Sequence, residues 1–201
     1  LTGNMARLAA QPLMFNPGSA WRYSKATDVL GVVMVAICGQ TLPEVIASLV
    51  TGPLGLDAAF HDQPARLAAT YHDSDPAPVR FDVETAIPMA GGSVLRLDPS
   101  RIGRRDDASA SGGGGMAGDT DSVLRLIEAL RSGPYLPDGL RAEALRLRTP
   151  EAMPTRGPGW GFCWLGSLLS DPAAAGTVLP AGTVAWGGVY GHSWLMSPAT
   201  G

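Results

Sequence analysis

The spacing of apolar residues along the chain predicts a series of helices, several of which carry a start or stop signal. Thr41 can cap a helix in which Glu44 reaches back to the cap, and Gly39 is a natural stop for the helix before it. That earlier helix is apolar on nearly all sides from Val29 to Cys38, so we expect it to be buried. The predicted helices cover residues 5–11, 24 or 27 to 38, 41–52, 119–132 and 138–148.

Runs of aromatic and β-branched residues, bounded by Gly and Pro, predict strands. The last two runs meet at Tyr190-Gly191, which predicts a tight hairpin, and two weaker runs earlier in the chain predict a strand pair. Residues 57–78 show few periodic apolar positions and are expected to form a long loop, as is the polar stretch 99–111. The predicted strands cover residues 79–83, 93–97, 160–169, 183–190 and 192–196.

Helices that precede strands favour an α+β architecture with an antiparallel sheet. We expect a single domain over residues 1–201, in which residues 1–118 are mainly helices and loops. Residues 119–201 supply further helices and the C-terminal strands. Because the chain begins with Leu1 and not with Met, we expect this domain to be part of a longer protein.

Composition and charge narrow the classes of partner. Hydrophobic residues make up 45% and charged residues 16%, which is an ordinary globular mixture. The net charge is −3 and there is no basic stripe to bind phosphates, so we expect no nucleic-acid partner. No apolar run reaches the roughly 18 residues that cross a bilayer, so we expect no membrane partner either. The oligomeric state is left open.

The cysteines and histidines suggest little chemistry of their own. Cys38 and Cys163 are expected to be buried free thiols. His61, His72 and His192 lack the spacing of metal ligands, so no metal site is predicted. For His192 two interpretations stay open. It could line the rim of a substrate pocket, or it could be a structural histidine whose hydrogen bonds are satisfied within its hairpin.

Two short segments combine glycines with aromatic residues. Residues 17–24 read Pro-Gly-Ser-Ala-Trp-Arg-Tyr-Ser and place Tyr23 just before the apolar helix, where a tyrosine is most often an amphipathic anchor. Residues 186–194 read Trp-Gly-Gly-Val-Tyr-Gly-His-Ser-Trp. Paired glycines weaken a strand and usually mark the close approach of a ligand or another backbone. Taken alone, the second segment is slightly better explained by a glycine bulge in a hairpin.

Together these segments resemble motifs of class C β-lactamases and family VIII carboxylesterases. Residues 17–24, followed by Asp-Val-Leu-Gly at 28–31, resemble the second motif of these enzymes, and Pro-Leu-Gly-Leu at 53–56 resembles an element that follows it. The glycine-rich residues 112–118 and the tail over residues 157–194 match in the same order, so the resemblance covers essentially the whole chain. It implies a serine β-lactamase/DD-peptidase-like fold, present in part: part of the helical region plus an antiparallel sheet with flanking helices.

The resemblance also implies an enzyme that hydrolyses short-chain carboxylic esters through an acyl-serine intermediate. In this family the serine lies in a Ser-x-x-Lys motif, whose lysine shares the proton transfers with a tyrosine that Tyr23 matches. The backbone N–H of Val189 would supply half of the oxyanion hole. The implied partner is a small-molecule ester, and no metal or organic cofactor is implied. The residues assigned to the edge of the substrate pocket are Trp186, Gly187, Gly188 and His192.

Two departures from class C β-lactamases favour small neutral esters over β-lactams. Those enzymes have Asn two residues after the tyrosine, where this chain has Lys25, and Lys-Thr-Gly where it has Trp186-Gly-Gly. The lysine of Lys-Thr-Gly helps to hold the β-lactam carboxylate, which Trp186 cannot do, although it would instead shape an apolar acyl or alcohol pocket. A β-lactamase or DD-peptidase-like enzyme is the alternative among enzymes.

The nucleophile motif is absent from the sequence. Lys25 is its only lysine, and Arg22 rather than a serine stands three residues before it. We therefore expect the Ser-x-x-Lys motif upstream of Leu1 in the longer protein. The alternative outside enzymes is a truncated, non-catalytic fragment.

We predict that the purified 201-residue chain neither reacts with a fluorophosphonate serine probe nor hydrolyses a short p-nitrophenyl ester, because it lacks the lysine-activated serine. Specific labelling of one serine, with turnover that is lost in Tyr23→Phe, would contradict the mechanism that the resemblance implies.

Overall fold

The computed structural model describes residues 2–60, 66–102, 110–150, 153 and 155–200. It falls into two compact units. Unit 1 comprises Leu1–Met5 and Lys25–Ser122, and unit 2 comprises Ala6–Ser24 and Val123–Gly201. The prediction of a single domain over residues 1–201 stays a prediction.

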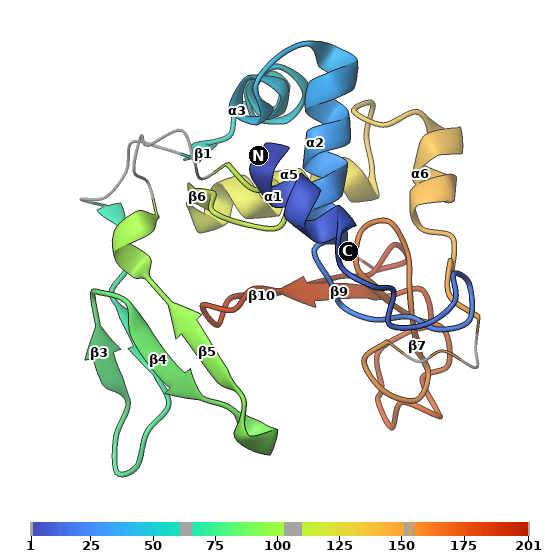
Figure 1. Cartoon of the computed structure of the whole chain (residues 1–201). Helices are drawn as coiled ribbons and strands as arrows, with labels where there is room; N and C mark the ends of the chain where they lie inside the picture. Colours follow the sequence, from blue (N-terminus) through green and yellow to red (C-terminus); the bar gives the residue numbers. More distant parts are fainter. Residues whose placement is uncertain (1, 61–65, 103–109, 151–152, 154, 201) are drawn as a thin grey trace. The chain divides into compact units, whose positions relative to one another are not determined.

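Along the chain, a series of helices is followed by short strands, and two further helices are followed by a second series of strands (Figure 1). The α-helices are α1 (Thr2–Ala9), α2 (Ala26–Cys38), α3 (Leu42–Ile46), α4 (Gly52–Leu54), α5 (Thr120–Arg131) and α6 (Asp138–Ala144). A π-helical turn, η1 (Ala47–Thr51), joins α3 to α4, and the 3-10 turns η3 (Ala90–Gly92) and η4 (Pro99–Arg101) follow later in the chain. The strands are β1 (Ala58–Ala59), β2 (Thr70–His72), β3 (Val79–Phe81), β4 (Thr85–Pro88), β5 (Val94–Leu97), β6 (Ala117–Gly118), β7 (Trp160–Phe162), β8 (Ser167–Leu169), β9 (Val184–Gly187) and β10 (Ser193–Met196).

Helix α2 ends where the sequence predicts but is far more exposed. Gly39 adopts the left-handed conformation (φ 64°), and its N–H donates to the Val35 carbonyl at 3.0 Å. Of the residues of α2 only Gly31 is buried, while Ile37 is 78% exposed. A helix that is apolar all round is buried only where neighbours cover every side, and within unit 1 they cover one side. Cys38 is exposed as well, which corrects its predicted burial.

The start of α3 is held by the predicted capping box. The Thr41 N–H donates to Glu44 Oε2 at 2.8 Å, and the Thr41 hydroxyl oxygen accepts from the Glu44 N–H at 3.5 Å. The bond from the Thr41 N–H, together with a bond from the Thr41 hydroxyl to the same Oε2 at 2.8 Å, holds the pKa of the Glu44 carboxyl below its ordinary value. The helical path continues through η1 and α4 to Gly55, whose left-handed conformation (φ 61°) ends it slightly later than predicted.

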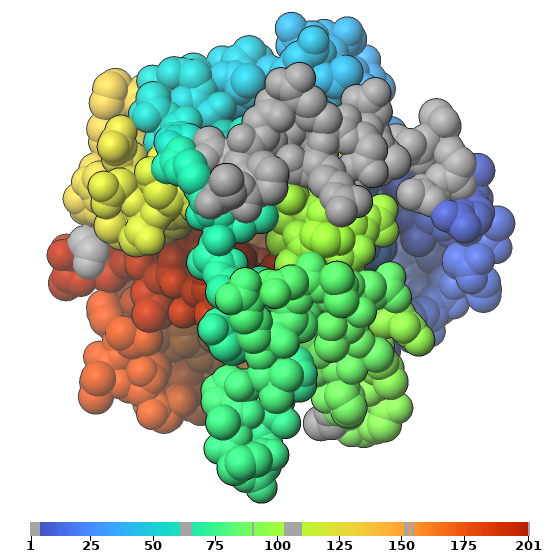
Figure 2. Space-filling model, turned by 90° about the vertical axis from the view of Figure 1, so that its left-hand side faces the viewer, coloured from blue at the N-terminus to red at the C-terminus, as the bar shows by residue number. Residues whose placement is uncertain are grey.

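The short strands of unit 1 differ from the prediction. Residues 57–78 contain β1 and β2 and are not one long loop, and the expected pairing of residues 79–83 with 93–97 is wrong. Instead β2 pairs with β3 and β4 pairs with β5, giving two local hairpins, which form much of the green region at the front of Figure 2. Strands of three or four residues are too short for an alternating pattern to identify their partners. The charged part of the predicted loop 99–111 lies outside the described residues.

The glycine-rich segment contacts the first turn of α2. The Ser111 hydroxyl donates to Asp28 Oδ1, and Asp28 also lies 3.7 Å from Nζ of Lys25. A Cβ on Gly112 would overlap the Thr27 carbonyl oxygen, so only glycine fits there. The segment is therefore fixed by side-chain and backbone contacts within unit 1, while β6 at its end pairs with β1.

Unit 2 is built around an antiparallel sheet in the order β10-β9-β8-β7. The predicted strand 160–169 is in fact two strands, because the chain reverses between them and the Cys163 N–H donates to the Gly166 carbonyl at 2.9 Å. The predicted hairpin of the last two strands is confirmed, with Gly187 opposite Ser193. The buried core of the sheet consists of Cys163, Leu168, Val184 and Met196, against which Ile127 of α5 and Leu145 and Leu147 pack.

The helices before the sheet begin as predicted. Asp119 caps α5 through Oδ1, which accepts from the Ser122 N–H at 2.7 Å. Helix α6 ends at Ala144, earlier than predicted, because the following residues turn to the edge of β7. There the Arg148 N–H donates to the Phe162 carbonyl at 2.7 Å, and the Phe162 N–H donates to Thr149 Oγ1 at 2.9 Å.

No helix among the described residues is both long and apolar enough to cross a bilayer by itself. Helix α2 and the segment Leu42–Leu54 reach that length and composition only as a pair, and the pair is bent by 82°. The described residues also contain no group of three or more His, Cys, Asp or Glu side chains that could hold a metal ion.

Gly161 on β7 is a position where we predict that any side chain destabilises the fold. A Cβ there would overlap Leu147 Cδ1 and approach Thr149 Oγ1 to 2.8 Å. We expect Gly161→Ala to lower the free energy of unfolding by about 1–3 kcal/mol in urea denaturation. The matched control is Gly139→Ala in α6, where a Cβ meets nothing within 4 Å and the helix should gain about 0.5–1 kcal/mol. Equal effects of the two substitutions would contradict the packing.

Candidate functional site

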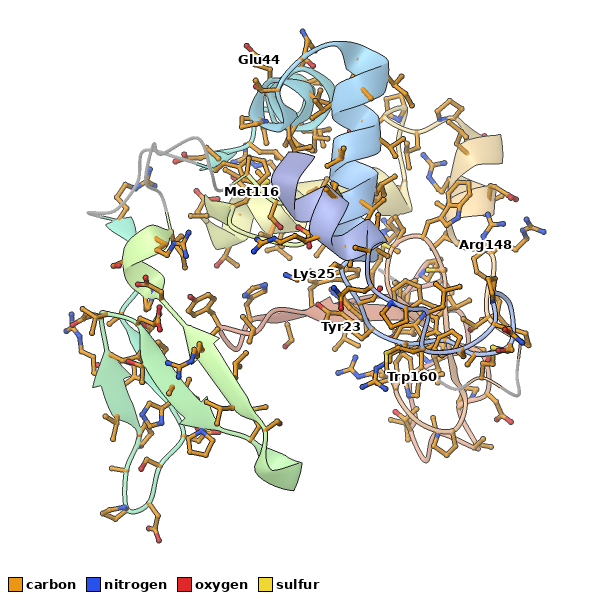
Figure 3. All side chains as sticks on the ribbon, viewed as in Figure 1. Tyr23, Lys25, Glu44, Met116, Arg148 and Trp160 are labelled. Atoms are coloured by element: carbon orange, nitrogen blue, oxygen red, sulfur yellow. The ribbon has the colours of Figure 1, made fainter. Side chains whose placement is uncertain are left out.

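Four aromatic rings in unit 2 connect the segment that carries Tyr23 to the sheet. The ring centroids of Tyr23 and Trp186 are 5.9 Å apart, those of Trp186 and Phe162 are 5.3 Å apart, and those of Phe162 and Trp21 are 5.5 Å apart. Rings at such separations attract each other by about 0.5–1.5 kcal/mol per pair beyond the area they bury. The rings therefore keep Tyr23 next to Trp186, the first residue of the Trp-Gly-Gly motif on β9. Figure 3 shows where the labelled Tyr23 lies on the ribbon.

Tyr23 combines this contact with access to solvent. Tyr23 is 69% exposed, whereas Trp186 is half-buried. A phenol can both donate and accept a hydrogen bond, so a tyrosine in this position can pass a proton to or from a molecule that approaches β9.

The loop between β9 and β10 leaves the backbone N–H of Val189 available. The Gly188 N–H donates to the His192 carbonyl at 2.9 Å, and the Gly191 N–H donates to the Gly188 carbonyl at 3.0 Å. Gly191 has φ 87°, which a glycine adopts without strain. Within the described part of the chain the Val189 N–H has no acceptor, so it can be offered to a ligand.

The two glycines of the motif lie close against other atoms of the hairpin, Gly187 against backbone and Gly188 against a side chain. A Cβ on Gly187 would lie 2.6 Å from the His192 carbonyl oxygen, and a Cβ on Gly188 would overlap the His192 imidazole. The imidazole of His192 thus lies against the backbone of Gly188, while the residue is exposed directly before β10. The hairpin interpretation of the glycines accounts for these contacts, and it leaves His192 accessible to a ligand.

The structure brings only part of the predicted set into contact. Tyr23 touches Trp186, and the remaining predicted residues share the β9–β10 hairpin. Lys25 belongs to unit 1, where its Nζ faces Asp28 and its side chain is 77% exposed. Sequence reasoning missed Phe162, whose ring touches two of the other three rings. The sequence signal for Phe162 is its place as an aromatic residue in a Gly-Trp-Gly-Phe run. That run does not specify the register of the strand, on which the contacts of Phe162 depend.

Cys163 is one residue from Phe162 but does not compete as a nucleophile. It is fully buried in the core of the sheet, and burial raises the pKa of its thiol. Because the thiolate is the reactive form, a buried thiol with a raised pKa is inert at neutral pH. Its predicted burial as a free thiol is confirmed.

A cleft of about 390 Å³ lies beside β7 and is separate from these residues. None of the site residues predicted from the sequence is among the described residues that line it. We therefore place the candidate site at the aromatic rings and the β9–β10 hairpin, where the predicted residues meet. The residues that line the cleft are Leu147, Thr149, Pro150, Pro158, Gly159, Trp160, Gly161, Ser170, Asp171 and Ala174.

Comparison with known proteins gives a consistent family. A family model described as Beta-lactamase matches residues 3–201. Esterase EstB of Burkholderia gladioli is 48% identical over 206 residues, which cover 100% of this chain and 52% of the esterase. The solved structure of EstCE1, described as a hydrolase with promiscuous acyltransferase activity, is 39% identical with a TM-score of 0.89 and covers 98% of this chain and 53% of its own.

A more distant solved structure shares the fold. Simvastatin synthase (LovD) from Aspergillus terreus is 19% identical with a TM-score of 0.70, over 94% of this chain and 50% of its own. The predicted α+β, serine β-lactamase/DD-peptidase-like fold is thereby confirmed. The chain spans about half the length of the curated relatives that it matches.

The contact of His192 with Gly188 gives a prediction for the hairpin. We expect Gly188→Ala to displace the imidazole, because the new methyl group would occupy the place of the ring. NMR of the histidine Cε1–H resonances, with His192 assigned through His192→Ala, should show a changed shift. Gly139→Ala, which is open to a methyl group, should leave the resonance where it is. An unchanged His192 resonance in Gly188→Ala would contradict the contact.

Proposed function

Because the chain belongs to the beta-lactamase family, in which it resembles family VIII carboxylesterases, we propose that it is part of a serine hydrolase of carboxylic esters. The contact of Tyr23 with Trp186 carries the proposal, because it joins the proton-carrying side chain to the strand of the third family motif. The 48% identity to an esterase and the 39% identity to a hydrolase with acyltransferase activity support ester chemistry.

The proposed reaction is acyl transfer through a serine. The serine oxygen attacks the ester carbonyl and loses its proton, the bond to the alcohol oxygen breaks, and water later releases the acid. The serine and its lysine would have to come from residues outside this sequence, since it contains no Ser-x-x-Lys. The 201-residue chain by itself is accordingly proposed to be inactive.

Tyr23 is proposed to carry the proton in this reaction. A phenol beside a lysine cation takes the proton of the attacking serine and returns it to the departing alcohol. The exposure of the Tyr23 residue, 69%, agrees with a group that must meet a substrate. Its ring contact with Trp186 restricts where the phenol can lie.

The Val189 N–H is proposed to bind the oxyanion. A backbone donor stabilises the negative charge that develops on the carbonyl oxygen, and the serine's own N–H would be the second donor. The described hairpin supports this role, because its two turn hydrogen bonds use Gly188 and Gly191 and leave Val189 free to donate.

Trp186 is proposed to set the preference for short neutral esters. The side chain is half-buried and bounded by the rings of Tyr23 and Phe162, so it presents an apolar surface without a positive charge. A β-lactam carries a carboxylate, which such a surface does not stabilise. Gly187, Gly188 and His192 complete this edge of the proposed pocket.

We predict that Tyr23→Phe, in the full-length protein that contains this chain, lowers kcat/KM for a p-nitrophenyl ester by about 10²–10⁴-fold. The substitution keeps the ring that stacks on Trp186 and removes only the hydroxyl. The matched control is Tyr71→Phe, at an exposed tyrosine on β2 of unit 1, which should leave kcat/KM unchanged.

The same assay separates the alternative function. A chromogenic cephalosporin should be turned over far more slowly than the ester if Trp186 sets the proposed preference. Faster hydrolysis of the cephalosporin would replace the esterase proposal by a β-lactamase, and full activity of Tyr23→Phe would remove Tyr23 from the mechanism.

A further inference from the structure

The segment that carries Tyr23 has little regular structure of its own. Residues 10–25 lie between α1 and α2, and all of them are described and outside any helix or strand. The backbone hydrogen bonds within the segment are local, such as that from the Ser19 N–H to the Asn16 carbonyl at 3.1 Å. Contacts between side chains and a rigid partner therefore contribute to the position of Tyr23.

Phe162 is such a rigid partner. On one side its strand pairs with β8, where Phe162 is opposite Ser167. On the other side its carbonyl accepts from the Arg148 N–H at 2.7 Å and its N–H donates to Thr149 Oγ1 at 2.9 Å. At the preceding residue, Gly161, a Cβ would overlap Leu147 Cδ1 and come within 2.8 Å of Thr149 Oγ1, so the side chains of both neighbours lie close against the strand. Both edges of the backbone at Phe162 are thus fixed.

The ring of Phe162 joins two of the other rings. It meets Trp186 edge to face, at 85° and 5.3 Å, and it lies 5.5 Å from Trp21. Trp21 stands two residues before Tyr23 and is half-buried. Tyr23 is therefore located in two ways: its own ring contacts Trp186, and its neighbour Trp21 is held by Phe162.

We propose that Trp21 and Phe162 are positioning residues that set where the Tyr23 phenol lies relative to β9. The inference rests on the proposed function, in which Tyr23 moves a proton. A proton donor must come within about 2.6–3.2 Å of the reacting oxygen, and a displacement of about 1 Å can cost about a hundredfold in rate. An exposed tyrosine on an irregular segment meets that requirement only if its neighbours hold it.

The test compares three variants of the full-length protein: Trp21→Ala, Trp21→Phe and Phe162→Leu. We expect Trp21→Ala and Phe162→Leu to lower kcat for a p-nitrophenyl ester by roughly 10- to 100-fold with little change in KM, because the proton transfer and not the binding of substrate is disturbed. Trp21→Phe keeps a ring against Phe162, so this variant should retain most of the kcat of the unsubstituted protein. The matched control is Phe15→Ala, an aromatic residue of the same segment outside the four rings, which should keep full activity.

A second readout does not depend on catalysis. In the full-length protein labelled with 3-fluorotyrosine, the fluorine NMR signal that disappears in Tyr23→Phe is that of Tyr23. The Tyr23 signal should shift and broaden in Trp21→Ala and Phe162→Leu. In Trp21→Phe it should lie close to its position in the unsubstituted protein, and in Phe15→Ala it should not change. If Trp21→Ala does not fold, Phe162→Leu decides.

An unchanged Tyr23 signal in Trp21→Ala or Phe162→Leu overturns the proposal, as does an equal loss of kcat in Phe15→Ala. A protein with no esterase turnover, whose Tyr23 signal still follows Trp21 and Phe162, would remove the proposed function but keep the positioning contacts.

Discussion

Ring contacts between an irregular segment and an antiparallel sheet are the constraint on which the candidate site depends. Backbone hydrogen bonds fix β7 and β9, but they do not extend to Tyr23, which is connected to the sheet through aromatic side chains alone among the contacts described. Such contacts are individually weak, and they depend on angle as well as distance. The site therefore derives its geometry from the rigidity of Phe162 and Trp186, and any change in the register of these strands would move Tyr23 with them.

The features that the sequence predicts correctly are local ones. The capping box of Thr41 with Glu44, the stop at Gly39 and the cap of α5 by Asp119 each involve residues within a few positions of one another. Their physics is contained in short stretches of chain, where side chains meet their own backbone. The β9–β10 hairpin was predictable for the same reason, since its turn is encoded by the residues that form it.

The predictions that failed depend on contacts between distant residues. The sequence gives no means of knowing that β3 pairs with β2 and not with β5, or that residues after Ala144 leave the helix to bond with Phe162. The apolar pattern of α2 shows that the helix can be buried but not which of its sides a neighbour covers. Likewise, the family resemblance identified Tyr23 and Trp186, yet the link through Phe162 appears only once the strand register is known.

The short connection after α6 has a consequence for how the sheet meets other proteins. An edge strand with free N–H and C=O groups is a template on which a foreign strand can add, which is a common route to aggregation. At Phe162 both backbone groups are already occupied, by Arg148 and by Thr149. The guanidinium of Arg148 also covers the ring of Trp164 at 4.3 Å and is paired with Glu143, which places charge beside that edge. The contacts that hold the backbone of Phe162 thus also protect this side of the sheet from intermolecular strand addition.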